Sequence, residues 1–565
     1  MRNIIVVDCI STGIHFIGDI INRGYNPIVL ELKAAGDDDE SYKAMLKSHY
    51  DEINENFDMI YEKDTYEETL EEVRKADPAL IVPGNEHGVI LATKLANDLG
   101  LLCNPIENLD AITLKHEMHN RLAEKGLRHI RGKPVHSLEE AIEFYDNEGL
   151  SEVVIKPIYS AGSNAVRICS NKQEMIDAIG ELFNRKNYYG GDIEELLIQE
   201  RIKGEEYIVN TVSCEGLHRV TMIWKYHKVK TNEGAIIYDT VETVNELGIA
   251  EAEMVEYAYN VADALGIEYG PVHGEYMIDE KGPVLIEVNC RPCGGNMPVK
   301  FLDQIAGQHE TDSILDSYLK PARFFEKAKQ RYRLLSHGAL KMFIVPEDII
   351  ARSAPMTSIS PNLKSFHKAS FAEMDHGGVF FTKTEDLTST CGIIYLVNED
   401  KSMLHDDINF LRSIEKYAFG LILSPELDKI DDLNEDEIIA NLNKIISRIS
   451  DYGTGLLITD QFLDNEDLLQ IGLEDITKVN EEFDYVIVNL NKSFVEKRDD
   501  ITVEDILSIF KRVKVGGIVF VPESTYRFVP GQRKGIEALM IDLDLRIEVP
   551  PHRMDVGVIA SRNVI

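Results

Sequence analysis

The first thirty residues of the chain limit the folds that it can adopt. Ile4 to Val7 form an unbroken run of β-branched residues, followed by a turn near Gly13, an amphipathic stretch through Ile21 and a second apolar run from Pro27 to Leu30. This order predicts a strand, a helix and a strand in a βαβ unit, which requires a parallel sheet. The turn holds one glycine, so the Gly-x-Gly-x-x-Gly fingerprint is absent and we do not expect an NAD site.

The net charge and the cysteines limit the binding partners and the cellular compartment that we expect for this protein. Lys and Arg total 59 against 97 Asp and Glu, and the formal net charge of −38 repels nucleic acid and anionic lipid. No apolar run reaches the roughly 18 residues of a membrane-spanning helix, and the chain opens directly on a strand pattern, so we expect a cytoplasmic protein without a signal peptide. The seven scattered cysteines do not fit a secreted disulfide framework, and we expect reduced thiols.

The strongest candidate for a chemical site is a pair of strands joined by a turn at residues 279–282. The first strand carries Glu275, and the second ends in Glu287-x-Asn289-x-Arg291. Because strand side chains alternate, Glu287, Asn289 and Arg291 should share one face. Two carboxylates and an amide oxygen suit Mg²⁺, and Arg291 offers a fork for a phosphate or an oxyanion. The solvated outer face of a β-hairpin is the alternative explanation.

Two lysines precede this acidic pair along the chain. Lys115 falls inside a helix expected from Leu109 to Glu124, with Asn108 as its N-cap. Lys156 ends a strand and is followed by the glycine-containing turn 159–164, whose backbone N–H groups and lysine charge suit a triphosphate. Either lysine alone is better explained as a surface charge. Residues 199–206 add a strand end and an acidic turn, a common pattern that proves nothing alone.

As an ordered set, these motifs resemble the ATP-grasp superfamily over roughly residues 1–425. The resemblance implies ATP between two α+β lobes, and it assigns roles to individual residues. The phosphate-binding residues would be Lys115, Lys156, Ser160, Ala161, Gly162 and Ser163. Adenine would lie at Glu200, Arg201 and Ile202, and ribose at Glu206. Mg²⁺, with Mn²⁺ as a substitute, would be held by Glu275, Glu287 and Asn289.

Within that superfamily the chain is more similar to the L-amino acid ligases, which form dipeptides. The likeness rests on residues 81–89 up to Asn104, the loop 160–163, His273-Gly274-Glu275, Arg291 with Gly294-Gly295-Asn296, and residues 383–412. It implies that Arg291 is catalytic and that His273, Gly294, Gly295 and Asn296 lie near substrate. A plain turn explains residues 294–296 equally well. Biotin carboxylases share Glu-x-Asn-x-Arg, but their phosphate loop carries more glycines and an arginine.

The resemblance divides the chain into four parts with mixed α/β and α+β folds. We expect a Rossmann-like pre-ATP-grasp domain at 1–107, an ATP-grasp domain at 108–330 with its lid at about 115–195, a C-terminal ligase subdomain at 331–428, and an additional α/β domain at 429–565. The last part resembles a Rossmann-like methyltransferase. Its glycines, Gly453 and Gly455, come before the first strand instead of after it, so we expect this part to be non-catalytic.

The implied activity is an ATP- and Mg²⁺-dependent carboxylate–amine ligase that forms an acylphosphate and releases ADP and phosphate. The substrates would be amino acids or small amines, without nucleic acid or membrane, and a homodimer is compatible with the sequence. Two alternatives stay open: a ligase that is also an S-adenosylmethionine-dependent methyltransferase, and a nucleotide-binding regulatory protein without turnover. The pair Cys290 and Cys293 has no second cysteine pair and is expected to be structural.

Overall fold

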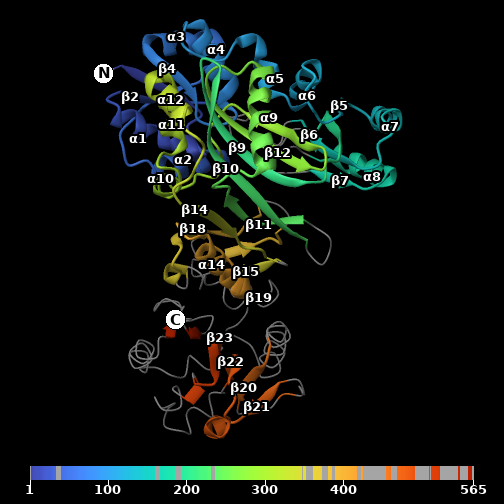
Figure 1. The fold of residues 1–565 in the computed structure, drawn as a ribbon, viewed down its shortest axis with the longest axis vertical. Helices are drawn as coiled ribbons and strands as arrows, with labels where there is room; N and C mark the ends of the chain where they lie inside the picture. Colours follow the sequence, from blue (N-terminus) through green and yellow to red (C-terminus); the bar gives the residue numbers. More distant parts are fainter. Residues whose placement is uncertain are drawn as a thin grey trace. The chain divides into compact units, whose positions relative to one another are not determined.

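The computed structural model describes residues 2–33, 40–158, 166–185, 193–230, 236–345, 348–351, 360–371, 379–384, 389–415, 422–423, 453–459, 463, 468–489, 508–509, 511–521, 545–547 and 558–562. The chain divides into two compact units; the colours of Figure 1 follow the residue number from the N-terminus to the C-terminus. The first comprises residues 1–340, 386–388 and 397–404, and the second comprises residues 341–385, 389–396 and 405–565.

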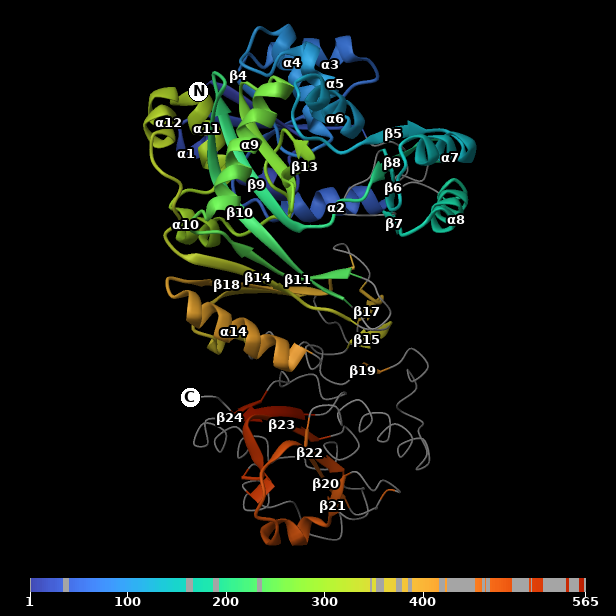
Figure 2. The same ribbon diagram turned by 45° about the vertical axis from the view of Figure 1, so that its right-hand side comes forward.

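The first unit begins with the expected parallel sheet. Its strands β1 (Asn3–Val7), β2 (Asn26–Glu31), β3 (Asp58–Tyr61) and β4 (Pro78–Pro83) lie in the order β3-β2-β1-β4. Helices α1 (His15–Asn22), α3 (Tyr66–Lys75) and α4 (Gly88–Asp98) pack against these strands, and α2 (Glu40–Asp51) lies between β2 and β3 along the chain (Figure 2). The β-branched residues of β1 are fully buried, with Ile4 and Val6 in one hydrophobic core and Ile5 and Val7 in the other. Burial on both faces explains why this strand is continuously apolar.

A small α+β subdomain follows in the same unit. Strands β5 (Gly132–Val135), β6 (Val153–Pro157), β7 (Arg167–Cys169) and β8 (Leu196–Glu200) form an antiparallel sheet in the order β5-β8-β6-β7. Helices α7 (Leu138–Asn147) and α8 (Lys172–Leu182) contribute apolar side chains to its core. Ser137 and Asn171 cap these helices, each accepting a hydrogen bond from a backbone N–H of the first turn. This sheet places Lys156 at the end of β6.

A larger antiparallel sheet positions the acidic pair. Its strands in this unit are β9 (Glu205–Cys214), β10 (Leu217–Lys230), β11 (Ile236–Thr243), β12 (Gly270–Asp279), β13 (Gly282–Asn289) and β14 (His337–Met342), in the order β13-β12-β9-β10-β11-β14. Helix α9 (Ile249–Leu265) packs against β12 and β13, and its buried residues join the same core as those strands. Helices α10 (Val299–Ala306), α11 (Glu310–Leu319) and α12 (Pro321–Ala328) follow the hairpin. Ile314 and Leu315 of α11 share a core with Val212 of β9 and the first sheet.

The single helix expected from Leu109 to Glu124 is wrong. The structure has two helices, α5 (Leu109–Thr113) and α6 (Lys115–Glu124), separated by Leu114 in an extended conformation. The side chain of Asn108 makes no capping hydrogen bond; its amide donates to the carbonyl of Gly266 at 3.5 Å instead. Tertiary packing therefore overrides the local helix signal, and Lys115 becomes the first residue of a helix.

The second unit contains three groups of strands. Strands β15 (Ile349–Ala351), β17 (Val379–Phe381) and β19 (Ile422–Leu423) form one small sheet, and β16 (Phe366–Phe371) pairs with β18 (Gly392–Asn398) before α14 (Lys401–Ile414). The last sheet contains β20 (Gly455–Thr459), β21 (Leu469–Ile471), β22 (Phe483–Asn489), β23 (Val513–Val521), β24 (Leu545–Ile547) and β25 (Val558–Arg562). Its order is β21-β20-β22-β23-β25-β24, with β25 antiparallel to both neighbours. Across the described residues of both units, no helix is both long and apolar enough to traverse a bilayer.

Candidate active site

The β12–β13 hairpin places two carboxylates directly opposite each other. Glu275 pairs with Glu287 in the antiparallel register, and His273 pairs with Asn289. Like charges in directly opposed positions destabilise a sheet unless a cation lies between them. The amide of Asn289 donates to Oε1 of Glu287 at 3.4 Å, so the predicted shared face of these two side chains is observed.

Lys115 supplies one cation to this pair. Its Nζ lies 2.7 Å from Oε2 of Glu287, and the two side chains are only 11% and 17% exposed. Burial opposes ionisation of Glu287, but the charges of Lys115 and Lys156 outweigh it and hold the pKa of this carboxyl well below its usual range. The break at Leu114 starts α6 at Lys115, whose side chain thereby reaches the hairpin.

Lys156 is the second cation and is more deeply buried. It is 9% exposed, and burial lowers its pKa to about 8 while Glu287 and Glu275 act in the opposite direction. Lys115 also repels it. The structure thus brings together both predicted phosphate lysines and both predicted carboxylates. The adjoining loop, with Ser160, Ala161, Gly162 and Ser163, lies outside the described residues.

The donor set around Glu275 suits a metal that is completed by phosphate oxygens. Within the described ranges, no three His, Cys, Asp or Glu side chains converge as a closed metal site. The chain offers two carboxylates and the amide oxygen of Asn289, which are hard ligands of the kind that Mg²⁺ takes together with substrate phosphates. The residues present therefore fit the Mg²⁺ that the sequence resemblance implies.

The residues expected at adenine and ribose have other partners in the structure. Arg131 binds the carboxylate of Glu200 through Nε at 3.0 Å and Nη2 at 2.8 Å. Arg201 donates from its backbone N–H to the carbonyl of Glu152 at 3.2 Å and from Nη1 to the Glu152 carboxylate at 2.8 Å. Ile202 follows directly in the turn towards β9. The side chains of Glu200 and Arg201 are thus held by other residues of the protein. The predicted contacts to adenine would have to come from backbone groups of this segment that these hydrogen bonds do not use.

Glu206 lies in a polar corner of the large sheet. Its carboxylate accepts from Lys228 at 2.5 Å and from the Tyr238 hydroxyl at 3.3 Å, and burial raises its pKa. The negative charge of Glu275 also raises the pKa of Glu206, because the two carboxylates repel each other. Lys228 and Tyr238 were not among the predicted site residues.

Arg291 connects the hairpin to the first sheet. Its Nη2 donates to Oε2 of Glu86 at 3.3 Å, its Nη1 donates to the carbonyl of Pro292 at 2.9 Å, and its buried Nε has no partner among the described residues. Glu86, which follows β4, was not predicted as a site residue. The only signal for it was its place in the passage 81–89 that resembles the ligases.

His273 and the turn after Arg291 complete the surroundings. His273 contacts Asn210 through Nδ1 at 2.9 Å and Glu275 through Nε2 at 3.6 Å, as expected for a neighbour of Glu275. Gly294 precedes Gly295 (φ +90°) and Asn296 (φ +44°), which have left-handed backbones. The Asn296 amide donates to Glu52 at 2.8 Å, which fixes the turn. A substrate role for residues 294–296 stays a prediction.

The cysteine predictions agree with the structure. All seven cysteines are free thiols. Cys290 lies in the hydrophobic core beneath the hairpin, and burial raises its pKa to about 12. Cys293 is also buried. A thiol held protonated in an apolar core is inert, so Cys290 serves packing.

Comparison with known proteins places this geometry in a family. Residues 150–299 match the ATP-grasp domain. The chain therefore contains a segment similar to ATP-grasp domains. Dapdiamide A synthase of Enterobacter agglomerans is 28% identical to it over 350 residues, which span 60% of this chain and 81% of that protein. Phosphoribosylamine–glycine ligase of Methanothermobacter thermautotrophicus is 27% identical over 221 residues, spanning 36% of this chain and 49% of that protein.

Solved structures share the ATP-grasp fold. The L-amino acid ligase from Bacillus licheniformis aligns with a TM-score of 0.56 and 16% identity, covering 73% of this chain and 97% of that one. N5-carboxyaminoimidazole synthase from Aspergillus clavatus, solved with ADP and 5-aminoimidazole ribonucleotide, aligns with a TM-score of 0.51 and 13% identity over 74% of this chain. The predicted fold class and the predicted similarity of this chain to ATP-grasp ligases that form C–N bonds are confirmed.

Proposed function

We propose that this protein joins the carboxylate of an amino acid to the amine of a second amino acid or small amine, releasing ADP and phosphate. The observation that carries the proposal is the convergence of Lys115, Lys156, Glu275 and Glu287 at one hairpin. The similarity to a dapdiamide synthase over most of that protein's length supports the same class of reaction.

The lysines are arranged to receive a polyanion. In the free protein Glu287 is the direct partner of Lys115, whereas Lys156 is buried beside them with a lowered pKa. A triphosphate would supply negative charge to both lysines in a site of low dielectric, where such interactions are strong. Glu275, Glu287 and Asn289 would hold Mg²⁺, or Mn²⁺ in its place, and the metal would offset charge on the phosphates.

The chemistry requires two displacements and no protein nucleophile. A carboxylate oxygen of the first substrate attacks the γ-phosphorus, the bond to ADP breaks, and an acylphosphate forms. The amine nitrogen of the second substrate then attacks the acyl carbon, the carbon–oxygen bond to phosphate breaks, and the nitrogen loses a proton. Arg291, with a buried Nε–H that has no partner among the described groups, is suited to stabilise the tetrahedral oxyanion.

The remaining assignments belong to the same proposal. The loop 160–163 would contact phosphates, residues 200–202 adenine, and Glu206 ribose. His273 and residues 294–296 would lie near substrate. The free thiols support a reducing, cytoplasmic environment, and a homodimer is compatible with the chain.

Isotope transfer tests the proposal. The full-length protein is supplied with Mg²⁺, ATP and pairs of amino acids whose carboxylates carry ¹⁸O. ADP and ¹⁸O-labelled inorganic phosphate are the expected products, because one carboxylate oxygen leaves with the phosphoryl group. AMP and pyrophosphate would overturn the acylphosphate mechanism, and no nucleotide product with any pair would favour a regulatory nucleotide-binding protein.

A further inference from the structure

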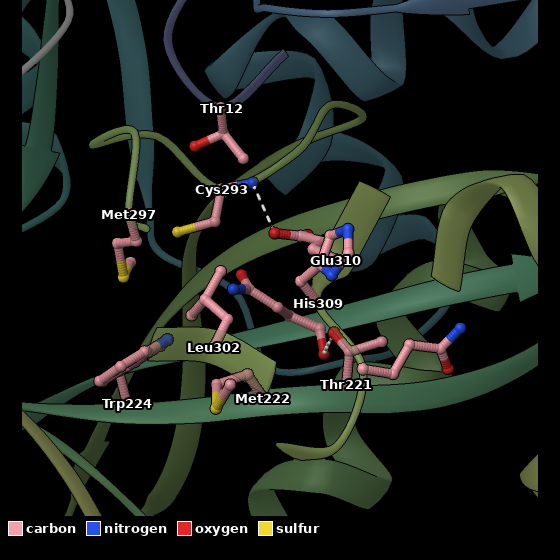
Figure 3. A pocket seen from close by; sticks show the side chains of 11 residues that line it. Thr12, Thr221, Met222, Trp224, Cys293, Met297, Leu302, His309 and Glu310 are labelled. Atoms are coloured by element: carbon pink, nitrogen blue, oxygen red, sulfur yellow. Dashed lines mark hydrogen bonds between the residues drawn. The ribbon is translucent and has the colours of Figure 1, made fainter. Parts of the chain in front are cut away.

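A small cavity borders the turn that follows Arg291. Its walls come from the turn after β1, strands β9 and β10, the segment after Arg291, α10 and the start of α11 (Figure 3). The cavity volume is about 20 Å³, which is enough for one water molecule and too small for a substrate or a nucleotide. Any occupant of this cavity is therefore of the size of a single water.

Two residues that line this cavity each contain a buried polar atom without a partner. Glu310 is 8% exposed, and its Oε1 has no hydrogen-bond partner among the described groups. Thr12 is 4% exposed, and its Oγ1 also lacks a partner within the part of the chain that the structure describes. Buried polar atoms are costly unless they form hydrogen bonds, and a buried water typically bonds about two to four of them. One water satisfies both atoms if it donates to the Glu310 carboxylate and accepts from the Thr12 hydroxyl.

The remaining side chains around the cavity leave these two atoms as its polar end. His309 is held by Asp19 at 2.9 Å, and Thr221 donates to the backbone carbonyl of Asn210 at 3.1 Å. Apolar side chains form the other side of the cavity, as Figure 3 shows: Met222, Trp224, Met297 and Leu302. The hydrogen bonds of a water in this cavity are therefore directed to Glu310 and Thr12.

Glu310 also holds the turn after Arg291. Its Oε2 accepts from the backbone N–H of Cys293 at 2.9 Å, a bond that a dashed line marks in Figure 3. Cys293 lies two residues after Arg291, whose positive charge acts on the Glu310 carboxylate. Further along the same turn, the ring of His15 contacts the carbonyl of Met297 at 3.1 Å. The turn is thus anchored at both ends, and the anchor nearer to Arg291 is a buried carboxylate.

We infer that Glu310 is a positioning residue for the ligase reaction and that one internal water completes its role. The water bridges Oε1 of Glu310 to Oγ1 of Thr12, so the loop after β1 fixes the carboxylate that fixes Cys293. Through these two bonds Glu310 determines where Arg291 lies, and it acts on the reaction only through Arg291. The inference rests on the proposed function, in which Arg291 stabilises the tetrahedral oxyanion.

An uncoupled reaction is the expected consequence of losing this support. The first displacement does not pass through the tetrahedral oxyanion, so ADP and the acylphosphate still form when Arg291 is displaced. The attack of the amine slows, because a misplacement of about 1 Å can cost about a hundredfold in rate. Solvent water then attacks the acyl carbon, the bond to phosphate breaks, and the free carboxylate and phosphate leave without amide formation.

The ratio of amide to ADP measures this uncoupling. Both products are quantified in the same reactions of the full-length protein with Mg²⁺, ATP and pairs of amino acids. Glu310→Ala should lower the amide formed per ADP at least about tenfold and change the KM for ATP by less than about twofold. Glu310→Gln keeps an oxygen for the Cys293 N–H and should restore most of the ratio. Glu326→Ala is the matched control, because Glu326 is 74% exposed and pairs only with Lys329 among the described residues.

Variants of Thr12 and crystal structures test the water itself. Thr12→Val removes the hydroxyl with little change of shape and should lower the amide formed per ADP, whereas Thr12→Ser keeps the hydroxyl and should not. A high-resolution crystal structure of the wild type, which requires no turnover, should show one ordered water within hydrogen-bond distance of Glu310 Oε1 and Thr12 Oγ1. In the structure of Glu310→Ala, Cys293 and Arg291 should be displaced.

The outcomes separate this inference from the proposed function. An unchanged ratio of amide to ADP in folded Glu310→Ala, or a wild-type cavity without a water on Glu310, would overturn the inference. A loss in Glu310→Gln as large as that in Glu310→Ala would also overturn it, because the hydrogen bond to Cys293 would then not be what supports Arg291. If the water is present and Glu310→Ala displaces Arg291, but no pair of amino acids yields ADP, the proposed function alone fails.

Discussion

The ammonium group of Lys156 is buried, and the nearby carboxylates of Glu287 and Glu275 do not fully offset the cost of burying its charge. Lys156 is 9% exposed, and burial lowers its pKa to about 8. Replacement of Lys156 by Met should weaken ATP binding by about ten- to a hundredfold, since a charged hydrogen bond to phosphate is lost. ATP titration by calorimetry measures this. Lys172→Met is the control, because Lys172 forms an exposed pair with Asp146 at 2.7 Å and should have no effect. Equal losses in both variants would show that Lys156 does not contact phosphate.

Glu287 is the carboxylate on which both lysines act. Glu287→Gln keeps the side-chain shape and an oxygen for Lys115 but removes the charge needed to bind a metal. ADP formation should fall below detection while the circular dichroism spectrum stays that of a folded protein. Glu280→Gln, on the exposed turn of the same hairpin, should keep full activity. Activity of Glu287→Gln at ordinary Mg²⁺ would remove Glu287 from the metal site.

At this scale the sequence predicted residues that share an element better than residues that meet across the fold. The spacing Glu287-x-Asn289 implied one face, and the hydrogen bond between the two side chains agrees. The partner of Arg291, Glu86, lies 205 residues earlier in the chain. Arg131, the partner of Glu200, lies 69 residues away. No local period encodes such pairs, because they form only when segments distant in the chain pair within one sheet, as for Arg131 and Glu200, or when two sheets come together, as for Arg291 and Glu86.

At the scale of elements, long-range packing decided what local propensity could not. The apolar pattern of residues 109–124 indicated one helix, and the structure interrupts it at Leu114. Leu109, Ala111 and Ile112 before the break and Met118 and Leu122 after it all enter the core shared with α9 and β13. Two short helices bury both sets and direct Lys115 to Glu287. The strands of the first sheet were easier to predict, because continuous β-branched runs have few alternatives.

His309 links three helices and makes stability depend on pH. Its ring bridges Asp19 of α1 and Asp303 of α10, and it immediately precedes α11. Burial disfavours the charged ring, but the hydrogen bonds and charges of both aspartates prevail and raise the pKa of His309 from 6.5 to about 9. The folded state therefore binds the proton more tightly. This stabilisation is complete below pH 6.5 and is lost as pH rises through about 9.

The predicted change in the free energy of unfolding is on the order of 2 kcal/mol between these limits. Urea titrations of wild type and His309→Gln at several pH values measure it. The difference between the two proteins should shrink as the pH rises above 9, because the wild-type ring is then neutral. A constant difference across this range would mean that His309 is not charged in the folded protein.

At the scale of the whole molecule, sequence resemblance located the ATP-grasp part and left the C-terminal part open. The aligned L-amino acid ligase is covered over 97% of its length by 73% of this chain, so a remainder of this chain has no counterpart in it. The six-stranded sheet of residues 455–562 contains three neighbouring parallel strand pairs and an antiparallel strand inserted near one edge. The limits of the four predicted domains stay predictions. The compact units are determined by contacts between segments that are distant in the chain, and no local sequence pattern marks where such contacts begin or end.

The last prediction is that the full-length protein does not bind S-adenosylmethionine, and the local structure around β20 gives the reason. A Rossmann-like methyltransferase needs an open glycine turn after its first strand, where the backbone approaches the cofactor. Here a Cβ at Gly455 would lie 2.1 Å from Cζ of Tyr485, so this glycine makes room for a ring. The turn before it is held by Asp484, which accepts from the Thr454 N–H at 2.8 Å. After β20, both backbone groups of Leu463 are bound by the side chain of Gln470, at 2.7 and 3.0 Å. Calorimetric titration with S-adenosylmethionine should give no saturable heat, with ATP as the positive control, whereas saturable binding would establish a second cofactor site and revive a bifunctional enzyme.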